Sequence, residues 1–308
     1  MAAIDHILVI GFGGPTKPEE IRPFLAEVTR GTRIPEARIT DVVHHYERVG
    51  GRSPYNDYTI RLCDRLRSAL QAQGVQVPLF LGMKNWHPLL AETISAIHQQ
   101  QLSHGLGVVL APHRCDASFE KYLRGIDEAK QQAAAPEIQY GYLGPWHEHP
   151  LFIAAQTDQI QQALNALSVQ VRASAHILFT AHSIPVEMAK HSRYVEEFEA
   201  SSRAVATALG RTNWSLAYQS RSGSSMQPWL EPDVESVIRE LKAKGEQQVV
   251  VVPIGFLCDH VEVLFDLDIE AKAVAEEVGL GFVRASTVMD HPQFVRMFVE
   301  LIQRDIRR

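Results

Sequence analysis

Apolar and polar residues alternate along the chain in a pattern that predicts eight strands with helices between them. Short apolar runs bounded by Gly, Pro or polar residues are typical of strands buried in a parallel sheet. The segments between these runs carry apolar residues three or four positions apart, which is the spacing of one helix face. Strands that alternate with helices predict an α/β fold built on parallel sheets. The predicted strands are His6–Phe12, Val77–Gly82, Gly107–Ala111, Gln139–Leu143, His176–Ala181, Ser215–Gln219, Gln248–Pro253 and Gly281–Arg284.

The helical segments follow the same alternation through both halves of the chain. They are Pro18–Arg30, Ile34–Val49, Asp57–Gln73, Pro88–Gln101, Ser118–Gln132, Leu151–Val171, Val195–Leu209, Pro232–Lys244, Asp259–Val278 and His291–Arg307. The segment Gly144–Pro150 (GPWHEHP) breaks the pattern after the fourth strand and predicts a domain boundary. Its His147 and His149 have a spacing found in metal sites, but we interpret them as loop residues.

We therefore expect two domains, 1–145 and 146–289. Each would be a four-stranded parallel sheet flanked by helices, with a ligand cleft between them. The last helix, 290–308, follows all eight predicted strands, and we consider it as an addition to the first domain.

The stretch Val249–Lys272 (VVVVPIGFLCDHVEVLFDLDIEAK) has the most distinctive pattern in the chain. Its valines predict a buried strand, and Asp259 followed by Glu262 predicts a capping box that opens a helix. One face of that helix is apolar. It consists of Val263, Leu264, Leu267, Ala271, Val274 and Val278.

Glu262, Asp266 and Glu270 form a separate acidic stripe on the same helix. At about 1.5 Å per residue, the stripe extends about 12 Å. Like charges one turn apart cost a few tenths of a kcal/mol per pair, which predicts positive charge nearby. Two interpretations remain open at this point. Either Glu262 caps the helix and the other carboxylates are solvated, or the three carboxylates guide a divalent cation to the carboxyl end of the sheet.

His182 stands at the end of another apolar strand, in the segment Ile177–Pro185 (ILFTAHSIP). Near physiological pH an imidazole is a neutral nitrogen ligand or a base. A single histidine is more often structural, but Glu262 follows a second strand end in the same half of the chain. One imidazole and one carboxylate that face each other can bind ferrous iron weakly and leave coordination positions open.

The glycine loop Gly11–Pro15 (GFGGP) follows the first strand and raises the question of a phosphate site. It lacks the GxGxxG spacing and a Lys-Ser/Thr pair, and Glu19 and Glu20 in the next turn would repel a phosphate. We expect that these glycines instead allow a flat ligand to approach the backbone, or form a tight turn. Ser53 also has two readings, as a hydrogen-bond partner of a ligand or as a helix cap.

Composition narrows the function. The chain has 308 residues, 45% of them hydrophobic, so it can bury a large core. The net charge of −6 argues against a nucleic-acid partner. The N-terminal apolar run lacks a basic segment before it, so we interpret it as a strand and not as a signal peptide. No apolar run reaches the about 20 residues that span a membrane.

The three cysteines, Cys63, Cys115 and Cys258, are widely spaced and form no CxxC pair. This pattern is typical of a reducing compartment, and we expect a cytoplasmic protein without disulfides. It also argues against an iron–sulfur cluster or a zinc site built from cysteine.

Taken together, these motifs resemble the ferrochelatases. The matching segments are Gly11–Pro15 with Pro23-Phe24-Leu25, Gly50–Pro54, Thr180–Pro185, Gln219–Asp233 with QPWLEPD, and Pro253–Lys272. They occur in the family's order over nearly the whole chain. The resemblance implies two Rossmann-like domains of the chelatase superfamily, which agrees with the strands predicted from the apolar pattern.

The resemblance also implies the reaction, which is insertion of ferrous iron into a porphyrin. Fe²⁺ would then be a substrate, with no tightly bound cofactor. His182 and Glu262 match the family's invariant pair, which binds iron or accepts the pyrrole protons, and Asp266 and Glu270 match its acidic row. The implied metal residues are therefore His182, Glu262, Asp266 and Glu270. A planar porphyrin must lose two N–H protons, and a site that bends it beside a base and a weak iron ligand lowers the barrier to metal entry.

The chain length and the opening GFGGP…PFLAEVTRG resemble the short bacterial enzymes that convert coproporphyrin III to Fe-coproporphyrin III in haem biosynthesis. By this resemblance the product would be handed to the next enzyme of the pathway. A protoporphyrin IX ferrochelatase and a non-catalytic porphyrin-binding or haem-binding protein remain as alternatives. The family pattern places five residues at the porphyrin: Phe12, Arg30, His45, Ser53 and Tyr122.

Two departures from the pattern concern these porphyrin residues. Phe12 stands where many relatives carry a tyrosine that ligates the iron of the product, and phenylalanine cannot ligate. Thr29 and His45 stand where those relatives carry arginines, so Arg30 and His45 would have to replace the missing guanidinium groups in part. Neither departure touches His182 or Glu262.

Overall fold

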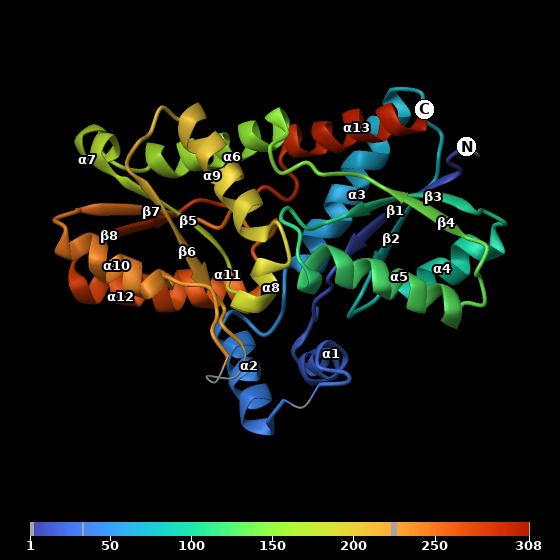
Figure 1. Cartoon of the computed structure of the whole chain (residues 1–308), viewed down its shortest axis with the longest axis horizontal. Coiled ribbons are helices and arrows are strands. Elements are labelled where there is room, and N and C mark those ends of the chain that lie inside the picture. Colours follow the sequence, from blue (N-terminus) through green and yellow to red (C-terminus); the bar gives the residue numbers. More distant parts are fainter. Residues whose placement is uncertain (1–2, 33, 223–226, 308) are drawn as a thin grey trace. The chain divides into compact units, whose positions relative to one another are not determined.

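The computed structural model of the chain describes residues 3–32, 34–222 and 227–307. The chain forms two compact units. The first comprises residues 1–110, 117–146 and 289–308, and the second comprises residues 111–116 and 147–288. Figure 1 labels the elements of both units.

The first unit is built on a four-stranded parallel sheet with the order β2-β1-β3-β4. Its strands are β1 (His6–Gly11), β2 (Leu79–Met83), β3 (His104–Val109) and β4 (Gln139–Tyr142). Strand β1 is central and buried along its whole length, which explains its unbroken apolar run. In the register of the sheet, Val9 pairs with Leu81 and with Val108.

Helices cover both faces of this first sheet (Figure 1). Helices α3 and α13 pack against each other, and so do α4 and α5. The helical elements are η1 (Pro18–Glu20), α1 (Ile21–Val28), α2 (Glu36–Arg48), α3 (Tyr55–Ala72), α4 (Leu90–Gln99), η2 (Asp116–Glu120), α5 (Lys121–Gln132) and α13 (Pro292–Ile306).

The second unit repeats this plan with the strand order β6-β5-β7-β8, all parallel. Its strands are β5 (His176–His182), β6 (Trp214–Gln219), β7 (Gln248–Val252) and β8 (Gly281–Arg284). Helices α6 and α9 pack together on one face of the sheet, and α10 and α12 pack together on the other (Figure 1). The helical elements are α6 (Pro150–Asn165), α7 (Val169–Ser174), α8 (Val186–Lys190), α9 (Tyr194–Ala208), α10 (Val234–Ala243), α11 (Val261–Phe265), the π-helical segment η3 (Asp266–Ala271) and α12 (Lys272–Val278).

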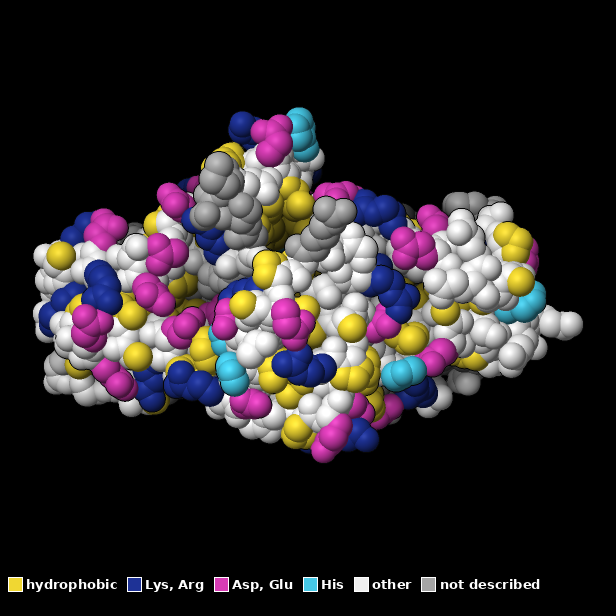
Figure 2. Space-filling model, turned by 90° about the horizontal axis from the view of Figure 1, so that it is seen from below, with side chains coloured by type: hydrophobic (Ala, Val, Ile, Leu, Met, Phe, Trp, Pro, Cys, Tyr) yellow, Lys and Arg dark blue, Asp and Glu magenta, His cyan; other side chains and the backbone are white. Residues whose placement is uncertain are grey.

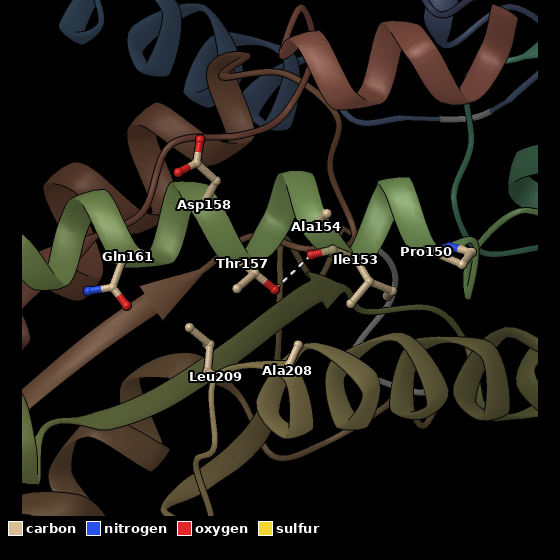
Figure 3. Close-up of a pocket in the computed structure, with 8 residues that line it drawn as sticks. All are labelled: Pro150, Ile153, Ala154, Thr157, Asp158, Gln161, Ala208 and Leu209. Carbon is tan, nitrogen blue, oxygen red and sulfur yellow. Dashed lines mark hydrogen bonds between the residues drawn. The ribbon is translucent and has the colours of Figure 1, made fainter. Parts of the chain in front are cut away.

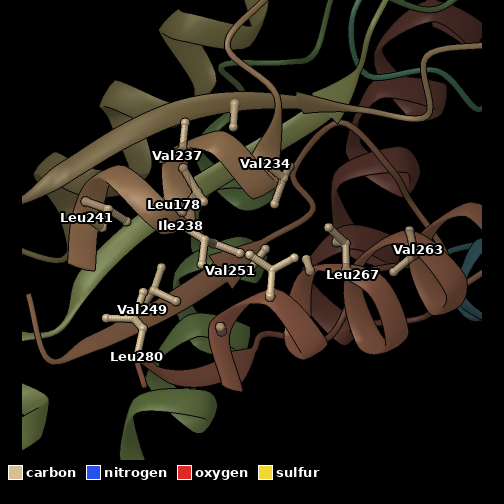
Figure 4. Packing of buried hydrophobic residues seen from close by; sticks show 14 of the residues in the cluster. Leu178, Val234, Val237, Ile238, Leu241, Val249, Val251, Val263, Leu267 and Leu280 are labelled. Carbon is tan, nitrogen blue, oxygen red and sulfur yellow. The ribbon is translucent and has the colours of Figure 1, made fainter. Parts of the chain in front are cut away.

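A cluster of buried apolar side chains joins these last helices to the sheet (Figure 4). Val263 from α11 and Leu267 from η3 are completely buried in it, together with Val249 and Val251 of β7. The apolar face predicted for this helix therefore exists, and it fixes the helix against the strand that precedes it.

All eight predicted strands are present within a few residues of their predicted bounds, and the predicted fold class is confirmed. The helix predicted at Leu151–Val171 is instead two helices, because the Ser168 side chain accepts a hydrogen bond from the backbone N–H of Val171 and starts α7. Helix α8 was not predicted. The predicted glycine-rich and serine-rich loop Gln219–Asp233 is described except for residues 223–226, which lie outside the described part of the chain.

The capping box predicted at Asp259 and Glu262 is wrong. Helix α11 begins at Val261, and its N-cap residue is His260, which makes no capping hydrogen bond with its side chain. The Asp259 carboxylate instead pairs with the guanidinium of Arg284, at 3.0 Å. The helix is also not a regular α-helix, since it passes through η3 before continuing as α12.

Within residues 3–32, 34–222 and 227–307, no helix has both the length and the apolar character needed to cross a bilayer. On the face drawn in Figure 2, acidic and basic side chains are interspersed, and neither sign forms a continuous patch.

Candidate active site

Strand β5 delivers His182 to its carboxyl end, where the chain leaves the sheet. The Nδ1 atom of His182 makes a short hydrogen bond to the carbonyl oxygen of Ser183. A carbonyl oxygen only accepts, so Nδ1 carries the hydrogen, and Nε2 has a free lone pair when the ring is neutral. The Tyr194 hydroxyl donates to the carbonyl oxygen of His182 at 2.9 Å and holds this backbone in place.

Glu262 lies in the first turn of α11 between two imidazole rings. Its Oε1 atom is 3.7 Å from Nε2 of His182, and its Oε2 atom is 3.2 Å from Nε2 of His260. About 40% of the Glu262 side chain is exposed, so a substrate can still reach the carboxylate. The interpretation of Glu262 as a helix cap is wrong, because its oxygens face imidazoles and not backbone N–H groups.

The two partners shift each other's pKa in opposite directions. Burial raises the pKa of Glu262, but His182 and then His260 outweigh burial, and the pKa ends below its ordinary value. Burial lowers the pKa of His182, but Glu262, the Ser183 carbonyl and Asp266 raise it above its ordinary value. The pair therefore favours an ionised carboxylate beside an imidazole that holds a proton readily.

Asp266 comes next in the acidic row, at the start of η3. The Ser220 hydroxyl donates a short hydrogen bond to its Oδ2 atom. Burial raises the pKa of Asp266 to about 7, and the neighbouring Glu262 and Glu270 carboxylates add to this rise. Glu270 is exposed at the far end of the row. The groups that face the first carboxylate of this row are the imidazole rings of His182 and His260.

Ser220 itself has a left-handed backbone, with φ of +61°. Such a conformation is uncommon outside glycine and is found more often at functional sites. It places the hydroxyl of a residue that directly follows β6 against the carboxylate of Asp266.

A second strand end fixes the backbone of Glu262. The side-chain amide of Gln219, the last residue of β6, donates to the carbonyl oxygen of Glu262 at 3.0 Å. The Thr180 hydroxyl donates to the amide oxygen of Gln219 at 2.9 Å. A chain of hydrogen bonds thus runs from β5 through β6 to the start of α11.

Sequence reasoning named His182, Glu262, Asp266 and Glu270 but missed the residues that surround them. His260 stands two residues before Glu262 and could have been noticed in the run Cys258–Glu262. Ser220, Gln219 and Tyr194 carry no comparable signal, because their role depends on contacts between distant segments.

Within the described part of the chain, no three His, Cys, Asp or Glu side chains gather as a ready-made metal-binding group. The acidic row is therefore spread out along the helix. A surface groove between α6 and α9, drawn in Figure 3, is lined by none of the predicted site residues.

The five predicted porphyrin residues all belong to the first unit. Phe12 is half-buried in the loop after β1, where its ring meets that of Phe24 edge to face at 6.1 Å. The Phe12 N–H donates to the Tyr55 hydroxyl at 2.8 Å. Ser53 is buried, and its hydroxyl accepts a hydrogen bond from the N–H of Tyr55.

The other three residues lie on helices or just beyond them. Arg30 is exposed after α1 and pairs with Glu27. His45 is half-buried on α2, and burial lowers its pKa. Tyr122 is buried in the first turn of α5.

The glycines of the loop Gly11–Pro15 are explained by packing inside the first unit. A Cβ atom at Gly13, which has φ of +88°, would lie 2.9 Å from the backbone nitrogen of Trp86. A Cβ atom at Gly14 would lie 2.7 Å from Cβ of Ser53. The loop is thus a tight turn closed by Trp86 and Ser53, and close approach of a flat ligand is not needed to explain its glycines.

The arrangement of two four-stranded parallel sheets is shared with a solved structure of the chelatase class. It is the crystal structure of the sirohydrochlorin chelatase SirB from Bacillus subtilis subspecies spizizenii, in complex with cobalt. The two structures superpose with a TM-score of 0.59 at 11% sequence identity, over 99% of this chain and 96% of the other. At this identity the similarity concerns the fold alone.

The chain belongs to the ferrochelatase family, whose family model matches residues 5–306. It is 38% identical to the ferrochelatase of Rhodopirellula baltica over 302 residues, which cover 97% of this chain and 85% of the relative. It is 35% identical to the coproporphyrin III ferrochelatase of Nocardia farcinica over 309 residues, which cover 98% and 88%. The enzyme class predicted from the sequence, a lyase of the ferrochelatase type, is confirmed.

Proposed function

We propose that this enzyme inserts ferrous iron into coproporphyrin III and gives Fe-coproporphyrin III in haem biosynthesis. The observation that carries the proposal is similarity over the full length to relatives named coproporphyrin III ferrochelatase, at 34–36% identity. The arrangement of His182 and Glu262 supports the chemistry that the family name implies.

In the proposed reaction, Fe²⁺ enters the porphyrin ring as two pyrrole N–H protons leave. The protein must therefore accept protons from the porphyrin while it passes the metal to the ring. Nε2 of His182 is the free basic atom of the pair, and Glu262 stabilises the imidazolium that forms there. We assign His182 as the proton acceptor. We assign the exposed Glu262 carboxylate, with His182 while its ring is neutral, as the weak iron ligand.

Asp266 and Glu270 are proposed as the route by which hydrated iron reaches this pair. Oxygen ligands suit a hard divalent cation, and a row spread along a helix binds it loosely enough to pass it on. The half-buried Asp266 has a pKa of about 7, so it exchanges a proton readily near neutral pH.

The proposed porphyrin residues are Phe12, Arg30, His45, Ser53 and Tyr122. Arg30 and His45 would receive propionates, and Phe12 would pack against the ring without ligating its iron. We further propose that no resident cofactor takes part, that the product passes to a later enzyme of haem synthesis, and that the reaction takes place in the cytoplasm. All three cysteines are buried and none of them forms a disulfide, which suits a reducing compartment.

The first test is an anaerobic assay in which purified enzyme receives Fe²⁺ with either coproporphyrin III or protoporphyrin IX. Loss of the free-base absorption bands should be faster with coproporphyrin III, by at least tenfold in kcat/KM. A faster rate with protoporphyrin IX would show that protoporphyrin IX, and not coproporphyrin III, is the preferred substrate. Tight porphyrin binding without any metal insertion would show that the protein is a non-catalytic porphyrin carrier.

Two variants test the residues in the same assay. His182→Ala and Glu262→Gln should each lower kcat by at least a hundredfold while changing the porphyrin dissociation constant by less than about threefold, because both act on the metal and the protons. His191→Ala is the matched control, since this histidine lies in the same unit at the end of α8 and its side chain is 77% exposed. Activity in His182→Ala equal to that of the control would remove His182 from the mechanism.

A further inference from the structure

Arg284, the last residue of β8, forms the most buried group of ion pairs near the acidic row. Its Nε and Nη2 atoms donate to the two carboxylate oxygens of Asp268 at 2.6 and 2.8 Å. Its Nη1 atom donates to Oδ1 of Asp259 at 3.0 Å and to the carbonyl oxygen of Ala285 at 3.2 Å. Only 13% of the Arg284 side chain is exposed.

The two carboxylates held by Arg284 bracket Glu262 and Asp266 in the sequence. Asp259 lies in the loop between β7 and α11, three residues before Glu262. Asp268 lies inside the π-helical segment, two residues after Asp266. The guanidinium of Arg284 therefore links the segment just before Glu262 to the segment just after Asp266.

Apolar packing and Arg284 hold different residues of this helix. Val263 and Leu267 hold its buried side against the sheet (Figure 4), whereas Arg284 binds the carboxylate of Asp268 within the π-helical segment. A π-helical turn inside an α-helix is rare and is found mostly at functional sites. A planar guanidinium that grips one carboxylate with two hydrogen bonds fixes both distance and orientation, which a single charge contact does not.

We propose that Arg284 is a positioning residue for metal insertion, which sets the spacing of Glu262 and Asp266 by holding Asp259 and Asp268. The inference rests on the proposed function, since it assigns Glu262 and Asp266 to the path of iron. Arg284 does not itself touch the metal or the porphyrin. A displacement of about 1 Å in a reacting group can cost about a hundredfold in rate.

The test compares Arg284→Lys and Asp268→Asn with the parent in the full-length enzyme. Lysine keeps the charge but lacks the planar pair of N–H donors that holds the Asp268 carboxylate with two hydrogen bonds, and Asp268→Asn leaves the pair with Asp259 in place. We expect Arg284→Lys to lower kcat/KM for Fe²⁺ by at least tenfold and Asp268→Asn by at least threefold. The porphyrin dissociation constant, measured by fluorescence quenching, should change by less than about threefold in both.

The matched control is Arg239→Lys in the same unit. Arg239 of α10 pairs with Glu277 near the end of α12 at 2.8 Å, and its side chain is 47% exposed. If Arg284→Lys and Asp268→Asn both stay within twofold of Arg239→Lys, the positioning role is wrong. If Arg284→Lys does not fold, Asp268→Asn decides alone.

A second readout separates this inference from the proposed function. Co²⁺ binding is followed by the visible absorption of the ion, without porphyrin. We expect weaker binding and an altered spectrum in Arg284→Lys, and parent-like behaviour in Arg239→Lys. If the parent enzyme inserts no iron, the proposed function is wrong. If the parent and Arg284→Lys bind Co²⁺ with the same affinity and the same spectrum, the positioning role of Arg284 is wrong.

Discussion

At the scale of single residues, the site is built from carboxylates that differ in their surroundings. Glu262 faces two imidazoles, which keep it ionised. Asp266 accepts a hydrogen bond from the Ser220 hydroxyl, and burial, followed by the carboxylates of Glu262 and Glu270, raises its pKa to about 7. The same kind of side chain is thus a constant anion at one position and a titrating group at the next.

The ionised Asp266 carboxylate should therefore lower the free energy of unfolding at pH values above the pKa that it has in the unfolded chain. Its pKa is 3.8 in the unfolded chain and about 7 in the folded one, so the folded state holds the extra proton and stability falls as pH rises from about 4 to 7. We expect Asp266→Asn to be more stable than the parent at pH 8, on the order of 1–2 kcal/mol after allowance for solvent screening, with no gain near pH 4. Urea unfolding at the two pH values measures this difference.

The same variant should be a slower enzyme. Loss of the carboxylate should lower kcat/KM for Fe²⁺ about tenfold. It should also remove the rise in rate that we expect of the parent as pH increases through 7. Asp64→Asn, on the exposed surface of α3, is the control for loss of a carboxylate. A variant that keeps the parent's rate and pH profile would leave Asp266 without a part in metal delivery.

At the scale of elements, the segment from α11 to α12 is shaped by its contacts as much as by its own sequence. Its apolar face follows from periodicity, because Val263, Leu267 and Ala271 are completely buried as predicted. The start of the helix and its π-helical turn do not follow from periodicity. Their residues Asp259 and Asp268 are bound by Arg284, which comes sixteen or more residues later in the chain. Local sequence favoured a capping box, and a distant arginine overrode it.

The difference between local pattern and distant contacts also explains which other strands and site residues could be predicted from the sequence. All eight strands were found, but for different reasons. The central strands β1, β5 and β7 are buried and have apolar runs, whereas the edge strands β4 and β8 are only partly buried and fit the alternation of strands with helices. Site residues at strand ends were found where the residue type is chemically distinctive, as for His182 and Glu262. Gln219 and Tyr194 were missed because amides and phenols occur in every context, and only the fold brings them to the backbone of Glu262 and His182.

Leu267 offers a test of how strongly the element supports the site. Leu267→Ala removes a completely buried side chain beside β7 and should cost about 2–5 kcal/mol of stability. Because Leu267 neighbours Asp266, Co²⁺ affinity should fall as well. Leu66→Ala, at an equally buried position of α3 in the first unit, should cost similar stability without changing Co²⁺ affinity. Equal losses of Co²⁺ affinity in both variants would mean that the apolar cluster has no specific role.

At the scale of the whole molecule, neither unit is a continuous piece of chain. Residues 111–116 belong to the second unit although they lie within the first half, and residues 289–308 return to the first. In the first unit Trp146 packs edge to face on Phe294 and Phe298 of α13, at 5.7 and 5.6 Å. The core of the first unit is therefore complete only when the last helix is present, and a fragment that ends at residue 288 should lose its cooperative unfolding.

Removal of residues 289–308 tests this dependence. The truncated chain exposes the apolar face of α3 that α13 covers, so its urea transition should broaden, and limited proteolysis should cut within residues 55–72. The point variant Phe298→Ala should keep a cooperative transition with a loss of about 3–5 kcal/mol. A truncated chain that unfolds as sharply as the parent would contradict the assignment of α13 to this core.

Buried histidines give the molecule a second global property, which is sensitivity to acid. Burial lowers the pKa of His6, His113 and His176, and for His113 it does so to about 3. The unfolded chain takes up these protons below about pH 6.5 while the folded chain does not, so the contribution of these three histidines to stability falls as the pH drops below about 6.5. His113 lies against the rings of Tyr194 and Phe198, with its Nε2 atom 3.1 Å from the Ser201 hydroxyl.

The contribution of His113 alone should reach about 2 kcal/mol at pH 5, since each pH unit below 6.5 corresponds to about 1.4 kcal/mol. The measured quantity is the change in unfolding free energy between pH 7.5 and pH 5, because replacement of a buried residue also lowers stability at neutral pH. We expect His113→Asn to show a change about 2 kcal/mol smaller than the parent, and the exposed His44→Asn is the matched control. If the parent and His113→Asn lose the same free energy of unfolding over this pH range, His113 takes up its proton in the folded state. Of the three buried histidines, His6 and His176 would then account for the acid sensitivity.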